Sequence, residues 1–335
     1  MRTLVIGGTG FLSGAVMAEC LAQGHMVSVV TRGQDSRPAL PPGVEALRAD
    51  RTKPDELWAA LGNRTFDLVV DCVLFRPNDA HTIVELLRNK TGRYVFISTD
   101  FVYGGEPRSF PLNENAPRQA LNSYGMQKAA CEDVFFAAWQ TERFPAVILR
   151  PPHIVGAGSL LGTGSLEGRD PWLLWRLRNK HPLVLLDGGA LLIQPVHKTD
   201  IARAVCALQT APLPIVGGQA YNIAGPDCVT TRAYYETVCS ILGVPAPDIL
   251  ALPASAYGAV FPDRVPFVQN RAYSTARLTR DTGFAPFVSL RASLEEMVME
   301  LERRGDPKDE SPTLDTPLHN LLRSQVQAVT TALKS

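Results

Sequence analysis

Thr3-Leu4-Val5-Ile6-Gly7-Gly8-Thr9-Gly10 stands at the start of the chain, where an apolar run leads directly into a glycine-rich turn. The apolar run predicts a buried strand, and residues 11–22 have the pattern of a helix that stops before Gly24. Glycines in such a turn let the backbone approach a pyrophosphate, which the free N–H groups of the helix N-terminus then bind. The stretch therefore predicts a dinucleotide-binding strand–turn–helix unit.

Outward from this turn, apolar strand patterns alternate with helical patterns as far as residue 150. Strands are expected at residues 26–30, 44–47, 68–70, 94–97 and 146–149, and helices at residues 54–61, 80–89 and 124–139. Strands that alternate with helices indicate a parallel sheet with helices on both faces. The first half of the chain therefore predicts an α/β fold with a doubly wound parallel sheet.

Composition argues against several classes of protein. The 335 residues include 33 basic and 33 acidic side chains, so the bulk charge gives no reason to expect nucleic-acid binding. The six cysteines form no Cys-x-x-Cys pair, and no metal site is expected. Neither a membrane-spanning apolar run nor a signal-peptide pattern is present, so we expect no membrane association and a cytoplasmic location.

Two short motifs further along the chain indicate proton-transfer chemistry. Tyr124 and Lys128 are four residues apart in a helical pattern, so their side chains share one face. A nearby cation favours the phenolate, and we therefore expect Lys128 to lower the pKa of Tyr124 and make it a general acid/base. Ser98-Thr99 ends an apolar run upstream, and the Thr99 hydroxyl could hydrogen-bond the same substrate oxygen.

Taken in order, these motifs resemble the extended short-chain dehydrogenase/reductase family, also called the NAD-dependent epimerase/dehydratase family. The resemblance runs from the glycine turn to about residue 300. It includes the segments 97–104, 124–128, 149–156, 194–202 and 221–225. The resemblance implies that Thr99, Tyr124 and Lys128 form the catalytic triad, and that a C-terminal lobe shapes the substrate pocket.

The resemblance also divides the chain. Residues 1–151 and about 190–232 are expected to form a Rossmann domain, and residues 152–189 with 233–305 a smaller C-terminal substrate-binding lobe. Residues 306–335 are expected to form an extension, in which Thr316-Pro317 starts a helix. The expected fold class is thus α/β, a doubly wound parallel Rossmann sheet with a smaller lobe.

Cofactor contacts are expected at the glycine turn and at the ends of the following strands. An acid that would hold an adenosine ribose 2′-hydroxyl is missing at residues 31–33, and Arg32 could pair with a 2′-phosphate instead. NADP(H) is therefore favoured, with NAD(H) as the alternative. Ser13 stands where the family usually has a third glycine. The expected cofactor residues are Gly7, Thr9, Gly10, Phe11, Leu12, Arg32, Asp50, Arg51, Cys72, Val73, Leu74, Tyr124, Lys128, Pro151 and His153.

The residues after Thr99 distinguish among the reactions of the resembled family. Its 4,6-dehydratases carry Thr-Asp-Glu, whereas this chain has Asp100 followed by the apolar ring of Phe101, as in keto-sugar reductases. Relatives that act on nucleotide sugars often carry an arginine where this chain has Gln194 or the residues just before it. Arg264, Arg271 or Arg277 could supply a cation instead. The candidate substrate residues are Thr99, Asp100, Phe101, Gln194 and Arg277.

We therefore expect an NADP-dependent oxidoreductase that reduces a keto group on a sugar-like small molecule, with Tyr124 as the acid. A sugar or nucleotide-sugar epimerase or dehydratase is the alternative, since an epimerase uses the same residues. A non-catalytic cofactor-sensing or RNA-binding relative is a further alternative, which the intact Tyr124–Lys128 pair and the balanced charge oppose. The resemblance leaves a homodimer open.

Overall fold

The computed structural model describes residues 1–33, 39–105, 108–163, 168–307 and 316–333. The chain divides into two compact units. The first comprises residues 1–154, 196–226 and 273–288, and the second comprises residues 155–195, 227–272 and 289–335. No helix among the described residues is both long and apolar enough to cross a membrane.

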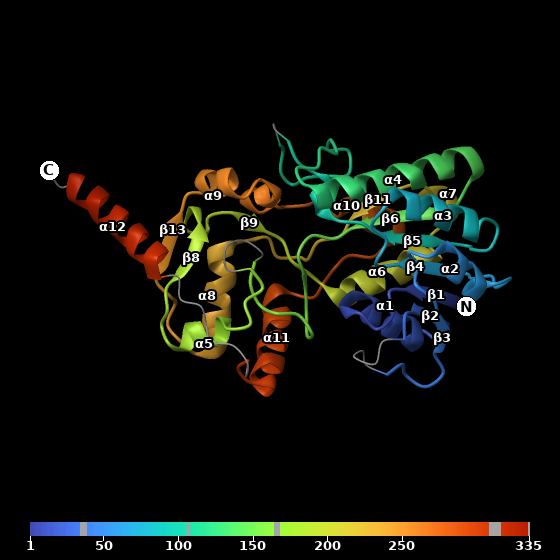
Figure 1. Cartoon of the computed structure of the whole chain (residues 1–335), viewed down its shortest axis with the longest axis horizontal. Coiled ribbons are helices and arrows are strands. Elements are labelled where there is room, and N and C mark those ends of the chain that lie inside the picture. The colour runs from blue at the N-terminus through green and yellow to red at the C-terminus, as the bar shows by residue number, and fades with distance from the viewer. Residues whose placement is uncertain (34–38, 106–107, 164–167, 308–315, 334–335) are drawn as a thin grey trace. The chain divides into compact units, whose positions relative to one another are not determined.

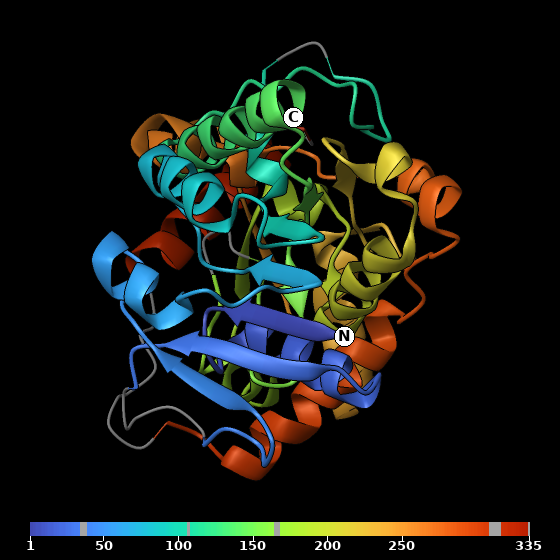
Figure 2. The same ribbon diagram turned by 90° about the vertical axis from the view of Figure 1, so that its right-hand side faces the viewer.

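The first unit is built on a seven-stranded sheet in which every neighbouring pair of strands is parallel. Figure 2 shows its strands lying side by side. The spatial order is β11 (Ala220–Asn222), β6 (Ala146–Arg150), β5 (Tyr94–Ile97), β4 (Leu68–Asp71), β1 (Arg2–Ile6), β2 (Met26–Thr31) and β3 (Glu45–Arg48). This order reverses between β1 and β4, as in doubly wound nucleotide-binding folds. The predicted fold class is confirmed.

Helices cover both faces of the sheet (Figure 1). One apolar core lies under α2 (Pro54–Leu61), α3 (Pro77–Leu87) and α4 (Ser123–Glu142), and another under α1 (Phe11–Ala22) and α6 (Lys198–Thr210). Strands β1, β4, β5 and β6 are buried on both faces, which explains their continuous apolar sequences, whereas the edge strand β3 is mostly exposed. The unit is completed by η1 (Asp100–Val102), α7 (Leu213–Val216), α10 (Ala276–Thr282) and β10 (Val196–His197).

The second unit has its own apolar core, to which α5 (Leu173–Arg178), α8 (Thr231–Leu242) and α11 (Leu290–Arg304) contribute. Two short strand pairs belong to it, β8 (Leu183–Leu186) with β13 (Ile249–Leu252) and β9 (Leu192–Ile193) with β12 (Val229–Thr230). Its remaining elements are η2 (Asp187–Gly189), α9 (Ala254–Val260), η3 (Pro262–Val268) and α12 (Thr316–Ala332), while β7 (Ile154–Val155) spans the boundary between the units.

The division differs from the one expected from sequence at several segments. Residues 190–195 and 227–232 group with the second unit instead of the first, and one longer segment differs in the opposite way. Residues 273–288, which we assigned to the substrate-binding lobe, group with the first unit. The reason lies in their contacts. Leu278 is fully buried in the core beneath α1 and α6, and Asp281 accepts a hydrogen bond of 3.0 Å from the Tyr221 hydroxyl on β11. The segment therefore brings new side chains to the Rossmann unit, including Tyr273.

Candidate active site and cofactor pocket

The glycine turn is shaped for the close approach of a ligand. Gly7 and Gly8 have φ angles of 134° and 64°, in the region that favours glycine. A Cβ atom on Gly7 would lie 3.1 Å from Cγ1 of Val73, so a larger residue would fill the cradle. Ser13, at the position of the family's third glycine, donates a hydrogen bond of 3.1 Å to the Gly7 carbonyl. Serine at this position thus supports the turn from within.

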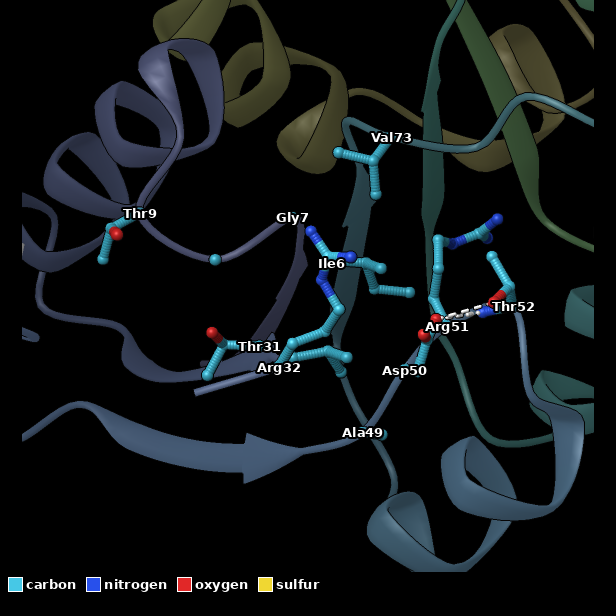
Figure 3. Close-up of a pocket in the computed structure, with 12 residues that line it drawn as sticks. Ile6, Gly7, Thr9, Thr31, Arg32, Ala49, Asp50, Arg51, Thr52 and Val73 are labelled. Atoms are coloured by element: carbon cyan, nitrogen blue, oxygen red, sulfur yellow. Dashed lines mark hydrogen bonds between the residues drawn. The ribbon is translucent and has the colours of Figure 1, made fainter. Parts of the chain in front are cut away.

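A cavity of about 240 Å³ opens beside this turn. Figure 3 shows the glycine turn on one side of it and the segment 50–52 on the other. Its lining comprises Ile6, Gly7, Gly8, Thr9, Val30, Thr31, Arg32, Ala49, Asp50, Arg51, Thr52 and Val73. Six of the expected cofactor residues are among these, namely Gly7, Thr9, Arg32, Asp50, Arg51 and Val73. Thr31 and Thr52 also line the cavity. No sequence motif indicates them, although each is adjacent to an expected cofactor residue, Arg32 or Arg51.

Of the two arginines that line the cavity, one is paired with acidic side chains and the other, among the described residues, is not. Arg51 forms ion pairs with the buried Asp71 at 2.6 Å and with Asp79 at 3.4 Å. Arg32 is exposed and forms no ion pair within the described part of the chain. Its charge contributes to the low pKa of Asp50, which is caused chiefly by hydrogen bonds from Thr52. Arg32 is therefore available to an anion, whereas the charge of Arg51 is already neutralised.

The ligand-binding chemistry of this cavity matches a dinucleotide. The lining glycine turn leads directly into the N-terminus of α1, and the free backbone N–H groups of a helix N-terminus suit a pyrophosphate. The glycine cradle and the Arg32 guanidinium complete a set of anion-binding groups. Gly10, Phe11, Leu12, Cys72, Leu74, Pro151 and His153, which we also expected to contact the cofactor, are not among the lining residues of this cavity.

The three residues of the expected triad come from two elements. Thr99 follows the end of β5, and Tyr124 and Lys128 lie near the start of α4. Asn122 caps α4 by accepting a hydrogen bond of 2.8 Å from Gly125 N, which begins the helix at the residue before Tyr124. The ammonium of Lys128 donates hydrogen bonds of 2.8 Å to the carbonyls of Leu74 and Ile97, and lies 6.0 Å from the centre of the Tyr124 ring. Lys128 thus joins the end of β5 to the segment that follows β4, close to the Tyr124 ring.

The pKa of Tyr124 differs from our expectation. Desolvation, together with the negative charge of Asp100, raises the pKa of Tyr124 to about 12, while hydrogen bonding with Thr99 acts in the opposite direction. Burial lowers the pKa of Lys128 to about 8, because this residue is only 5 % exposed. The prediction that Lys128 lowers the pKa of Tyr124 is therefore wrong for the chain by itself. Tyr124 is protonated at neutral pH.

Aromatic side chains frame the phenol of Tyr124. Phe75 stacks on its ring with 5.7 Å between the centroids, and Phe101 meets it edge-on at 6.2 Å. Both follow strands of the sheet: Phe75 comes shortly after β4, and Phe101 lies in η1, which follows β5. Phe75 was not foreseen from sequence, because a lone phenylalanine after a strand carries no motif. The surroundings of the phenol are thus apolar on two sides.

Asp100 is buried beside this group. Its Oδ1 accepts a hydrogen bond of 3.2 Å from the Thr99 hydroxyl, and its Oδ2 accepts one of 2.7 Å from the Tyr273 hydroxyl. Its backbone N–H donates to the carbonyl of Pro151 at 3.1 Å, which places Pro151 next to the catalytic segment. Sequence reasoning missed Tyr273, which lies 173 residues away along the chain.

The remaining candidate substrate residues are placed differently. Arg277 lies in the first unit, where its guanidinium is 3.6 Å from Glu114 and donates a hydrogen bond of 2.5 Å to Asn115. Its charge is thus partly neutralised within the chain. Gln194 belongs to the second unit, and its role in substrate binding remains a prediction. Groups of three or more metal-ligating side chains do not occur among the described residues.

The fold, the glycine cradle and the Thr99–Tyr124–Lys128 group together define a Rossmann-fold enzyme of the dinucleotide-dependent class. Residues 3–224 match the model of the NAD dependent epimerase/dehydratase family. Because the match covers more than half of the sequence, the chain belongs to that family, whose members bind NAD(P). This confirms the resemblance on which the triad was assigned.

Individual relatives show the range of chemistry within the family. One is 2′-dehydrokanamycin reductase of Streptomyces kanamyceticus, 30% identical over 73% of this chain and 68% of that protein. Another is dTDP-6-deoxy-L-talose 4-dehydrogenase (NAD(P)(+)) of Kitasatospora kifunensis, 30% identical over 76% of this chain and 82% of that protein. The structure of UDP-glucuronic acid 4-epimerase from Bacillus cereus in complex with NAD has a TM-score of 0.70 at 17% identity, covering 91% of this chain and 99% of that one, which supports the fold.

Proposed function

We propose that this protein is an NADP-dependent reductase of a keto group on a sugar-like substrate. The observation that carries the proposal is the protonated phenol of Tyr124 beside the Thr99 hydroxyl, with the Phe101 ring where dehydratases of the family carry a carboxylate. A neutral phenol can donate a proton to a ketone oxygen, whereas elimination of water needs a base that Phe101 cannot supply. The 2′-dehydrokanamycin reductase relative supports the same class of reaction.

Different residues of the chain would have separate roles in such a reduction. Gly7, Thr9 and Arg32 would hold the dinucleotide, which supplies the hydride when bound. Tyr124 would give its proton to the ketone oxygen as negative charge develops there. Lys128, fixed by the carbonyls of Leu74 and Ile97, would place its positive charge near the phenol, and hydrogen bonding with Thr99 would favour the phenolate that the transfer leaves.

The substrate that this proposal favours carries no nucleotide. A diphosphate needs unpaired cations nearby, and the guanidinium of Arg277 already contacts Glu114 and Asn115. We therefore infer a keto-sugar, a cyclitol or an aminosugar intermediate, of the kind that specialised biosynthetic pathways use. Because one relative is a dTDP-sugar dehydrogenase, nucleotide-linked ketoses are the appropriate substrates for comparison.

The proposed function is tested by NADPH oxidation with a panel of keto-sugars and inososes, with and without a nucleotide. Stoichiometric formation of an alcohol and of oxidised cofactor would support it. Conversion of a sugar alcohol to its epimer without net oxidation of added NADPH would contradict it and identify an epimerase. Loss of water from a 6-hydroxy sugar would identify a dehydratase and would equally contradict the proposal.

The choice between the two cofactors depends on Arg32. We expect the protein to bind NADPH at least about tenfold more tightly than NADH, which corresponds to about 1.4 kcal/mol. Arg32→Ala should remove most of this difference and leave NADH binding nearly unchanged, because NADH lacks the 2′-phosphate that the guanidinium would contact. Fluorescence titration of both cofactors measures the two dissociation constants.

A matched control for Arg32 is Arg64→Ala, since Arg64 is a surface arginine whose guanidinium pairs with Glu45 at 3.0 Å and lines no part of the cavity. It should leave both dissociation constants unchanged. Equal affinities of the parent protein for NADPH and NADH would contradict the role given to Arg32.

A further inference from the structure

The carboxylate of Asp100 is held between two hydroxyl groups. It is 3% exposed, and its two oxygens accept hydrogen bonds from Thr99 at 3.2 Å and from Tyr273 at 2.7 Å. Tyr273 is itself buried, forms a β-bridge with Leu112, and packs its ring against that of Tyr103 with 6.1 Å between the centroids. Tyr273 is therefore a fixed donor to Asp100.

This arrangement determines what the hydroxyl of Thr99 can do. The hydroxyl has one proton, and that proton points to Asp100. Its oxygen also accepts a hydrogen bond of 3.2 Å from the backbone N–H of Phe101. The second lone pair of the oxygen is left as an acceptor. While Thr99 is bonded to Asp100, it can receive a hydrogen bond from Tyr124 or from a substrate hydroxyl, and it cannot donate one to the ketone oxygen.

We propose that Asp100 and Tyr273 are positioning residues that direct the proton of Thr99 and keep the Asp100 carboxylate out of proton transfer. The inference rests on the proposed reduction and assigns Tyr124 as the donor to the ketone oxygen. Once Tyr124 has given up its proton, the hydroxyl of Thr99 can turn from Asp100 to the phenolate. Tyr273 then remains as a donor to the buried charge of Asp100.

The electrostatics of Tyr124 fit this sequence of events. Desolvation and, after it, the charge of Asp100 raise the pKa of Tyr124 and keep the phenol protonated before the transfer. Hydrogen bonding with Thr99 lowers that pKa, which is the effect expected of a donor to the phenolate. Only the second effect depends on the orientation of the Thr99 hydroxyl. Removal of the Tyr273 hydroxyl should disfavour most the orientation in which Thr99 donates to the phenolate. In that orientation Asp100 would have neither the Thr99 nor the Tyr273 hydroxyl as a donor.

The experiment is a double-mutant cycle on single-turnover NADPH oxidation. Tyr273→Phe should lower the rate about tenfold and leave the dissociation constant of NADPH unchanged, since the lost hydrogen bond goes to a charged group. In the Asp100→Asn background the same change should cost less than about twofold, because no buried charge is left to hold. The Thr99→Val background should give the same small cost, because the hydroxyl that Tyr273 positions is then absent.

Tyr221→Phe is the matched control. The Tyr221 hydroxyl is also bonded to a carboxylate, that of Asp281 at 3.0 Å, and Tyr221 is likewise buried in the first unit. This control should alter unfolding without altering turnover. A parental rate for Tyr273→Phe, or a tenfold loss that persists in both the Asp100→Asn and Thr99→Val backgrounds, would overturn the inference.

Urea unfolding of the same variants separates this inference from the proposed function, because it needs no substrate. The unfolding free energies of Tyr273→Phe and Asp100→Asn should be non-additive. If they are non-additive and no ketone is reduced by the parent protein, the proposed function fails while the hold of Tyr273 on Asp100 is supported. Additive values overturn the inference whatever the activity.

Discussion

Tyr124→Phe is expected to lower turnover at least about 100-fold, because it removes the proton donor and keeps the ring. Proton transfer by a positioned side chain contributes about 10²–10⁴-fold in rate. The ring contacts with Phe75 and Phe101 need no hydroxyl, so the fold should persist. The affinity for NADPH should stay within about threefold of the parent, since the loss lies in the chemical step. Single-turnover oxidation of NADPH with the best ketone measures the rate.

Two further variants show whether the loss is specific to the acid. Thr99→Val should cost less than Tyr124→Phe, because it removes an orienting hydrogen bond and leaves the acid in place. Lys128→Met should lower both the rate and the NADPH affinity, since this ammonium bridges the carbonyls of Leu74 and Ile97 beneath the site. If Tyr124→Phe retains a near-parental rate, Tyr124 is not the acid and the proposed mechanism is wrong.

The parts of the fold that sequence predicts well are those determined locally. The glycine turn, the helix from Phe11 to Ala22 and the strand from Tyr94 to Ile97 occur as expected, because each is bounded by its own signals. The same holds for the start of α2, where Pro54 occupies the first turn. Alternation of such elements is enough to predict a parallel sheet with helices on both faces.

The features that sequence could not predict depend on contacts between distant residues. The direction of the Tyr124 pKa shift follows from desolvation of the phenol and from the charge of Asp100, neither of which the four-residue spacing to Lys128 reveals. The charge of Arg51 is neutralised by Asp71 at the end of β4 and by Asp79 in α3, both distant in sequence from Arg51. The assignment of Tyr273 to the first unit likewise depends on the fold, because no local pattern links it to Asp100.

The largest expected effect on stability comes from a buried ion pair behind the catalytic segment. Glu132 on α4 is fully buried, and its carboxylate accepts hydrogen bonds of 3.0 and 2.6 Å from Arg150 at the end of β6 and of 2.6 Å from the Ser98 hydroxyl. Arg150 also donates to the hydroxyl of Tyr103 at 2.7 Å, which in turn donates to Asn222 on β11. The pair thus joins α4 to the ends of three strands next to Thr99.

Arg150→Met is expected to lower the free energy of unfolding by about 3–5 kcal/mol, because it leaves the charge of Glu132 buried without its main partner. Glu132→Met combined with Arg150→Met should be less destabilised than Arg150→Met alone, since no unpaired charge then remains. The control is Arg291→Ala, which breaks the exposed pair with Glu295 and should cost less than about 1 kcal/mol. Urea unfolding followed by circular dichroism measures all three. A loss for Arg150→Met no larger than that of Arg291→Ala would show that the pair does not secure the catalytic segment.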